Sequence, residues 1–173
     1  MGSGKSSIGR RLAERLGLPF TDADREIEVA TGATIPLIFE LEGEAGFRER
    51  ERETLMRLCQ GGPQVIATGG GAVLRADNRE LLAQAGFVLF LDVDLDSQLR
   101  RLANDRSRPL LQRRDRREVL ARLSQERAPL YAEVADLRYP TGGGSVRHAV
   151  EQLVGLLQAH WQHPPLPSTE PAL

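Results

Sequence analysis

The sequence predicts an α/β domain with a parallel sheet, because segments of strand character alternate with segments of helical periodicity. Two glycine-rich runs support this class: residues 2–6 lead into an amphipathic helix, and residues 69–71 follow an apolar strand. Glycines at such places belong to the sheet edge where open α/β proteins bind ligands. The 173 residues fit one domain, expected over residues 1–161, followed by a proline-rich, disordered tail over residues 162–173.

The first half of the chain is expected to contribute two strands. A loop and a helix occupy residues 4–16, where Ile8, Leu12 and Leu16 share one face. A short strand follows at residues 19–21. The other elements expected here are helices at 24–31, 35–42 and 47–59 and a buried strand at 64–68, which ends at the triple glycine.

The second half repeats the alternation of helices and strands. We expect a helix at 76–85, an apolar strand at 87–93 and a helix at 95–104. Residues 105–115 are polar and rich in arginine, which favours a loop that can close as a lid. A further helix, a last strand at 137–139 and a helical stripe from Val146 to Leu157 complete the domain.

Charge and cysteine content exclude several classes of protein. The formal net charge of −1 argues against nucleic-acid binding and against a membrane-surface protein. The single cysteine, Cys59, cannot form a disulfide within the chain and suits a reducing compartment. The sequence shows no signal-peptide pattern and no apolar run of the roughly 20 residues that span a bilayer. We therefore expect a cytoplasmic protein, and a monomer.

The run Gly2-Ser3-Gly4-Lys5-Ser6-Ser7 has the chemistry of a phosphate-binding loop. Glycines let backbone N–H groups surround a phosphate chain, and the following helix adds the positive end of its dipole. Lys5 is the only lysine in the sequence, which suggests a position where a planar arginine will not serve. The alternative is a flexible Gly/Ser segment with a chance lysine. The full motif G-x-x-x-x-G-K-[ST] also needs an earlier glycine and a strand, so we expect Met1 to be an internal methionine.

Two carboxylates and a glycine run are predicted at the ends of neighbouring strands. Asp22 and Asp24 can divide the work of holding a metal's water shell and accepting a proton from a hydroxyl. The alternative is one helix N-cap and one solvated acid. The run Gly69, Gly70 and Gly71 leaves a bare backbone where a ligand can approach, although a simple turn would also explain it.

Arginines supply the candidate anion-binding groups. Arg48 begins a highly charged helix and would ordinarily be a surface residue. Arg127 precedes Ala128-Pro129-Leu130-Tyr131, and its planar fork suits a carboxylate. In the loop at 105–115, arginines can close over a triphosphate, although a solvated charge run is the alternative. These loop arginines are Arg106, Arg108, Arg113 and Arg114.

These pieces together resemble the shikimate kinase family over residues 2 to about 158. The matching runs are GSGKSSIGRRLAERLG (2–17), DADREIEVATG (22–32), IFELEGEAGFRERE (38–51), ATGGGAV (67–73), RPLL (108–111) and ERAPLYAEVAD (126–136). The resemblance implies a P-loop kinase fold with a five-stranded parallel sheet flanked by helices, its first strand missing from this chain. It also implies phosphorylation of the 3-hydroxyl of shikimate by ATP and Mg²⁺, on the route to chorismate and aromatic amino acids.

For the nucleotide side, the resemblance implies roles for individual residues. Ser6 would ligate Mg²⁺, with Asp22 in its outer shell, and Lys5 would contact the transferring phosphates. Arg108 would act from the lid at about residues 105–115, and Arg101 would stack on adenine. The resemblance gives no adenine contact near Gly142-Gly143-Gly144, where family members often carry a basic residue.

For the acceptor side, the resemblance implies that Asp24 binds the shikimate hydroxyls and acts as base. Arg48 and Arg127 would clamp the carboxylate, with Gly69, Gly70 and Gly71 beside the substrate. The catalytic residues would then be Lys5, Asp24 and Arg108.

Two other functions compete with this interpretation. A gluconate kinase-like enzyme would share the phosphate loop, but it has no obvious need for two carboxylate-binding arginines. A non-catalytic nucleotide-binding module is favoured only by the incomplete phosphate-loop motif.

Overall fold

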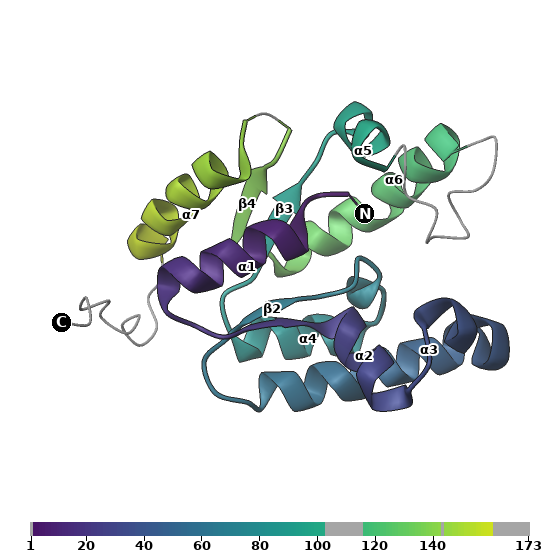
Figure 1. Ribbon diagram of the computed structural model, residues 1–173. Helices are drawn as coiled ribbons and strands as arrows, with labels where there is room; N and C mark the ends of the chain where they lie inside the picture. Colours follow the sequence, from purple (N-terminus) through teal and green to yellow (C-terminus); the bar gives the residue numbers. More distant parts are fainter. Residues whose placement is uncertain (1, 103–115, 143, 161–173) are drawn as a thin grey trace.

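The computed structural model describes residues 2–102, 116–142 and 144–160. Its four strands are β1 (Phe20–Asp22), β2 (Val65–Ala67), β3 (Leu89–Asp92) and β4 (Leu137–Pro140). β1 pairs in parallel with β2, and β3 pairs in parallel with β4. The α/β class with parallel pairing is therefore confirmed (Figure 1).

The two strand pairs do not join into one sheet, which differs from the prediction. In residues 2–102, 116–142 and 144–160, no ladder of backbone hydrogen bonds connects β2 with β3. Each pair is thus a separate two-stranded sheet, and Val65 and Ile66 are only partly buried where a buried strand was expected. Within the described residues β2 has a strand neighbour on one side only, which leaves its other edge without a ladder. A total of five strands stays a prediction.

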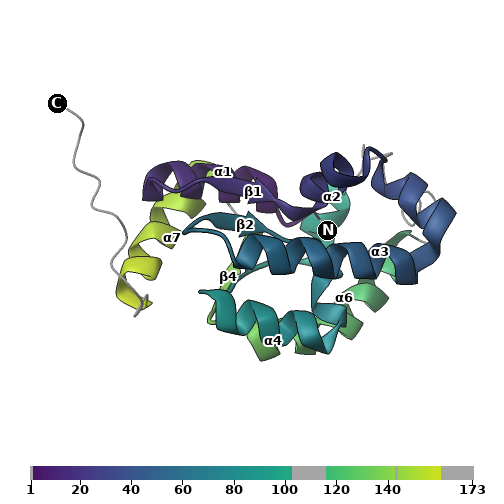
Figure 2. The same cartoon turned by 90° about the horizontal axis from the view of Figure 1, so that it is seen from below.

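Seven helices and one short 3₁₀ helix surround these strands in the described part of the chain. They are α1 (Lys5–Leu16), α2 (Ala23–Thr31), α3 (Ile35–Cys59), η1 (Ala72–Leu74), α4 (Ala76–Ala85), α5 (Leu95–Leu102), α6 (Arg116–Val134) and α7 (Val146–His160). Figures 1 and 2 show α3 and α4 beside β2 and α7 beside α1. The predicted lid at 105–115 and tail at 162–173 lie outside the described residues.

The helices predicted at 35–42 and 47–59 form the single element α3, interrupted at Gly43. The backbone there has φ 71° and ψ −174°, a combination that only glycine adopts readily. The interruption separates a short segment, mostly exposed but with Ile38 buried, from a longer and highly charged segment. The prediction of two helices is therefore right in substance, but the second begins earlier than Phe47.

The main core lies between α1 and α7 and connects the two strand pairs. The predicted face of α1, with Ile8, Leu12 and Leu16, packs against Val150 and Leu153 of α7. Partly buried residues of three strands pack on the same cluster, namely Val65, Leu89, Leu91 and Leu137. In the described part of the chain, no backbone ladder joins β2 to β3. The side chains that pack beneath α1 hold these two strands to one core.

A smaller core fixes α2 against α3. Ala23, Leu55, Leu58 and Ala72 form one buried cluster, which ties the start of α2 to α3 and to the 3₁₀ helix. Asp24 lies in α2, and the glycine run at residues 69–71 directly precedes the 3₁₀ helix. In the described residues, no helix combines the length and apolarity that a membrane span requires.

Candidate active site

The glycine-rich loop enters α1 through left-handed backbone. Gly2 has φ 66° and Gly4 has φ 85°, and Gly4 is the N-cap of α1. Gly4 makes no side-chain capping bond to α1, and the first N–H groups of an α-helix have no partner within the helix itself. Lys5 and Ser6 occupy the first turn of α1. Uncapped amides, a helix dipole and a lysine are suited to a phosphate chain.

Asp22 links the phosphate loop to the first carboxylate-bearing helix. The Ser6 hydroxyl donates to Asp22 Oδ2 at 2.7 Å, and the Asp24 backbone N–H donates to Asp22 Oδ1 at 3.2 Å. Asp22 is therefore the N-cap of α2, as one alternative proposed, and also a partner of Ser6. A hydroxyl and a carboxylate held together at a helix N-terminus are oxygen donors of the kind that Mg²⁺ prefers.

Arg101 joins the phosphate loop to the segment after β4. Its guanidinium donates to the Gly2 carbonyl oxygen at 3.0 Å and to the Thr141 carbonyl oxygen. These bonds hold Arg101 beside the glycine-rich loop, while its stacking on adenine stays a prediction. Arg108, like Arg106, Arg113 and Arg114, lies outside the described residues.

The register of β1 and β2 brings the acidic and glycine-rich segments together. Asp22 is paired with Ala67, so Asp24 and Gly69 each lie two residues beyond that pair. A Cβ atom on Gly69 would lie 2.8 Å from Asp24 Oδ1 and 2.7 Å from Glu51 Oε1. Gly69 therefore lies beside both carboxyl groups, and a side chain at this position would force them to shift.

Arg48 is mostly buried in this site, not a surface residue. Its NH1 donates to Glu51 Oε2 at 2.7 Å, and its NH2 donates to Glu44 Oε1 at 3.1 Å. The side chain of Arg48 is 13% exposed and that of Glu51 is 1% exposed. A Cβ atom on Gly71 would lie 2.5 Å from both terminal nitrogens of Arg48, so Gly71 touches the guanidinium directly.

Glu51 is a site residue that the sequence analysis missed. Burial raises the pKa of its carboxyl group, while the charge of Arg48 acts in the opposite direction. Its Oε1 atom is buried without a hydrogen-bond partner among the described residues. A signal for it exists in the sequence, because Glu51 lies on the same helical face as Leu55 and Leu58.

Arg127 reaches the glycine run from α6. Its NH1 donates to the Gly70 carbonyl oxygen at 3.1 Å, and the Tyr131 hydroxyl donates to the same oxygen at 2.6 Å. Arg127 Nε is buried without a hydrogen-bond partner in the described part of the chain. Such an atom can be satisfied by a polar ligand. Tyr131 was also missed at the level of sequence.

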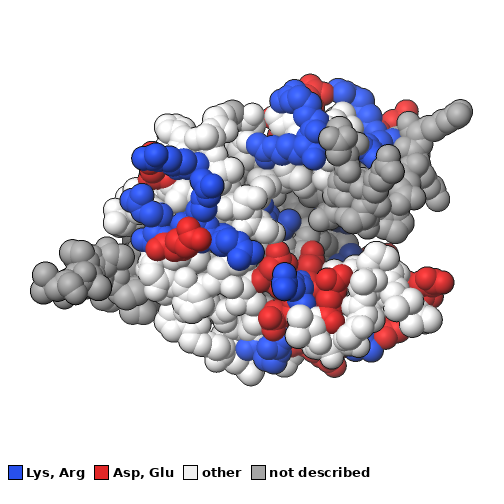
Figure 3. Space-filling model, viewed as in Figure 1, with Lys and Arg blue, Asp and Glu red and all other residues white. Residues whose placement is uncertain are grey.

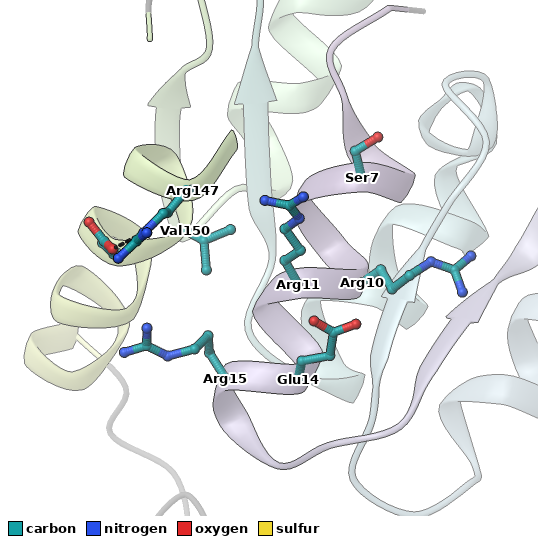
Figure 4. Close-up of a pocket in the computed structure, with 8 residues that line it drawn as sticks. Ser7, Arg10, Arg11, Glu14, Arg15, Arg147 and Val150 are labelled. Atoms are coloured by element: carbon teal, nitrogen blue, oxygen red, sulfur yellow. Dashed lines mark hydrogen bonds and ion pairs between the residues drawn. The ribbon is translucent and has the colours of Figure 1, made fainter. Parts of the chain in front are cut away.

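A separate hollow of about 620 Å³ lies along α1 and α7 (Figure 4). Its charged side chains are exposed, so water and salt screen them. Figure 3 shows basic side chains gathered over α1 and α7 and acidic ones over α2. The hollow is lined by Ser7, Arg10, Arg11, Glu14, Arg15, Arg147, Val150 and Glu151. Of these, Ser7 was a predicted ATP-binding residue, whereas the predicted residues Asp22, Asp24 and Gly69 lie at the ends of β1 and β2.

Comparisons with known proteins agree with this arrangement. A family model described as shikimate kinase matches residues 1–158. Shikimate kinases of Stenotrophomonas maltophilia (strain K279a) and Xanthomonas axonopodis pv. citri (strain 306) are 53% and 52% identical over 162 residues, covering 94% of this chain and 90% of each relative.

Solved structures are similar in fold as well as in sequence. The shikimate kinase from Acinetobacter baumannii in complex with shikimate superposes with a TM-score of 0.90 at 45% identity, covering 94% of this chain and 91% of that one. The shikimate kinase from Aquifex aeolicus gives a TM-score of 0.81 at 33% identity, covering 94% of each chain.

Proposed function

The chain belongs to the shikimate kinase family, and we propose that it transfers the γ-phosphoryl group of ATP to the 3-hydroxyl of shikimate. The products would be shikimate 3-phosphate and ADP, in the biosynthesis of chorismate and the aromatic amino acids. One observation carries this proposal: Asp24, Arg48 and Arg127 converge on a single glycine run. Asp22 accepts hydrogen bonds from the Asp24 backbone N–H and from the Ser6 hydroxyl, and so links Asp24 to the phosphate loop.

Two guanidinium groups account for recognition of the acceptor's carboxylate. Arg48 lies against Gly71, and Arg127 donates to the Gly70 carbonyl oxygen. Each can present a planar fork of N–H donors to a carboxylate. Arg127 Nε, buried without a partner among the described residues, supports a polar ligand at this place. A gluconate kinase-like function has no comparable support.

The phosphate loop would hold ATP through its backbone amides and Lys5. Ser6 and Asp22 would hold Mg²⁺, since a hydroxyl and a carboxylate 2.7 Å apart fit an ion that takes few protein ligands and keeps several waters. When bound with ATP, Mg²⁺ neutralises charge on the β- and γ-phosphates. Arg101 would keep the loop in place through the Gly2 carbonyl group.

Catalysis would rest on positioning and electrostatics. The 3-hydroxyl oxygen attacks the γ-phosphorus, and the bond from that phosphorus to the β–γ bridging oxygen breaks. Asp24, which lies in the first turn of α2, would accept the hydroxyl proton. Lys5 would stabilise the charge that spreads over the transferring group, together with Arg108 from a lid at about residues 105–115.

We also propose that the protein is a cytoplasmic monomer. The single cysteine supports a reducing compartment. Residues 1–161 would form the catalytic domain and residues 162–173 a disordered tail, as their proline content favours.

A coupled assay of ADP release tests the proposed reaction. With ATP, Mg²⁺ and shikimate we expect a rate that saturates with shikimate, and ³¹P NMR should identify a phosphate monoester on the 3-oxygen. Gluconate at the same concentration should leave the rate at background. An ADP release that is equal with and without shikimate would contradict the proposal.

A further inference from the structure

We propose that Tyr131 is a positioning residue of the acceptor site, which fixes the glycine run through a hydrogen bond to the Gly70 carbonyl group. The inference rests on the proposed function, because it concerns how shikimate would be held. Tyr131 itself would touch neither shikimate nor ATP. It would act through the backbone that forms one wall of the site.

The contacts of Gly70 show how α6 holds that wall. The Tyr131 hydroxyl and Arg127 NH1 donate to the same carbonyl oxygen, at 2.6 Å and 3.1 Å. The two donors lie four residues apart, one helical turn, and therefore share a face of α6. A carbonyl oxygen has two lone pairs and can accept both bonds. Tyr131 makes the shorter bond of the two.

The glycines on either side of Gly70 in the sequence lie against the charged groups of the site. Gly69 packs against the carboxyl groups of Asp24 and Glu51, and Gly71 packs against the guanidinium of Arg48. Because these glycines have no side chains to adjust, any shift of their backbone changes the positions open to all three groups. By fixing Gly70, the Tyr131 bond would therefore hold the backbone against which these charged groups pack.

The ring of Tyr131 gives its hydroxyl a fixed origin. It stacks on Phe90 of β3, with the ring centres 4.6 Å apart. The glycine run follows β2, and no backbone ladder joins β2 to β3 in the described residues. Tyr131 therefore links the two strand pairs at the site itself. Burial raises the pKa of the phenol, so the hydroxyl remains a donor at the alkaline pH of a kinase assay.

The chain offers a matched control, because it has two tyrosines. Tyr139 lies in the core between α1 and α7, and its hydroxyl donates to Gln152 Oε1 at 2.7 Å. Tyr131→Phe and Tyr139→Phe each delete one partly buried hydroxyl and one hydrogen bond. A merely structural role would give the two variants the same phenotype.

The test measures steady-state kinetics and thermal unfolding for the wild type and both variants. We expect Tyr131→Phe to raise KM for shikimate about fivefold to tenfold, the effect of one lost hydrogen bond, with KM for ATP unchanged. Tyr139→Phe should lower the melting temperature similarly and leave both KM values unchanged. An unchanged KM in Tyr131→Phe, or an equal rise in both variants, would overturn the inference.

Failure of the proposed function and failure of the role of Tyr131 give different results. If the wild type shows no turnover with shikimate, the proposed function fails; if only the contrast between the variants is absent, the role of Tyr131 fails alone. Should Tyr131→Phe not fold, Phe90→Leu provides the test, since it keeps the hydroxyl but removes the ring that orients it. We then expect a raised KM for shikimate, and an unchanged value would refute the role.

Discussion

Gly71→Ala tests whether the glycine run shapes the acceptor site or merely turns the chain. The new Cβ atom would lie 2.5 Å from both terminal nitrogens of Arg48. The guanidinium must therefore retreat by about 0.9 Å to reach 3.4 Å, the near limit of ordinary van der Waals contact. It cannot retreat freely, because Glu51 and Glu44 hold it from the other side at 2.7 Å and 3.1 Å.

The size of the effect follows from that displacement. A misplacement of about 1 Å in a substrate-positioning group costs on the order of 10²-fold in rate. We therefore expect kcat/KM for shikimate to fall between about tenfold and a hundredfold. The phosphate loop is untouched, so KM for ATP should stay the same. Backbone strain does not contribute, because Gly71 has φ −99°, a conformation that alanine adopts without difficulty.

Steady-state kinetics with shikimate and ATP varied in turn measure this effect, alongside urea unfolding. Gly62→Ala is the control, because its Cβ atom would meet no atom within 4 Å and its φ lies outside the left-handed range. This control should keep wild-type kinetics. If Gly71→Ala also keeps them, Arg48 is not held where a ligand needs it, and the clamp hypothesis is wrong.

Three other substitutions address the remaining groups. Asp24→Asn should lower turnover by at least about 10²-fold, as loss of a general base does, while calorimetry shows unchanged MgATP affinity; near-normal turnover would exclude Asp24 from proton transfer. Asp22→Asn keeps a good N-cap for α2 but should raise the Mg²⁺ concentration for half-maximal activity by about tenfold; an unchanged Mg²⁺ dependence would remove Asp22 from the metal site. Glu51→Gln removes a carboxyl group whose pKa burial raises above 4.5, so the folded state binds its proton more tightly than the unfolded state. The stability of the wild type relative to this variant should therefore fall as pH rises from 4.5 through the raised pKa, and a difference in urea unfolding that is constant with pH would contradict it.

The parts of the site that lie at strand ends could be predicted from sequence. Asp22 and Asp24 follow β1, and the glycine run follows β2, so a parallel pairing of these strands brings them to one edge. The strands were visible as short apolar runs bounded by turn residues. The separation into two sheets was not predictable in this way, because periodicity shows which residues are apolar and not which strand edges meet.

The residues that sequence reasoning missed, Glu51 and Tyr131, both lie on helices. Glu51 stands in a run of charged residues, where a carboxylate is ordinarily solvated. Its position on the face of Leu55 and Leu58 is visible in the sequence, but only the partner Arg48, three residues earlier, makes burial of the charge tolerable.

Tyr131 is a harder case, because its partner is a backbone carbonyl group that no sequence pattern marks. What the sequence does show is that Tyr131 follows Arg127 by one helical turn, so both donors face the same way. If Arg127 is assigned to a ligand, Tyr131 lies on the same helical face, and its contacts then need an explanation as well. The same reasoning applies to Glu51 beside Arg48, and it identifies both missed residues from the two arginines alone.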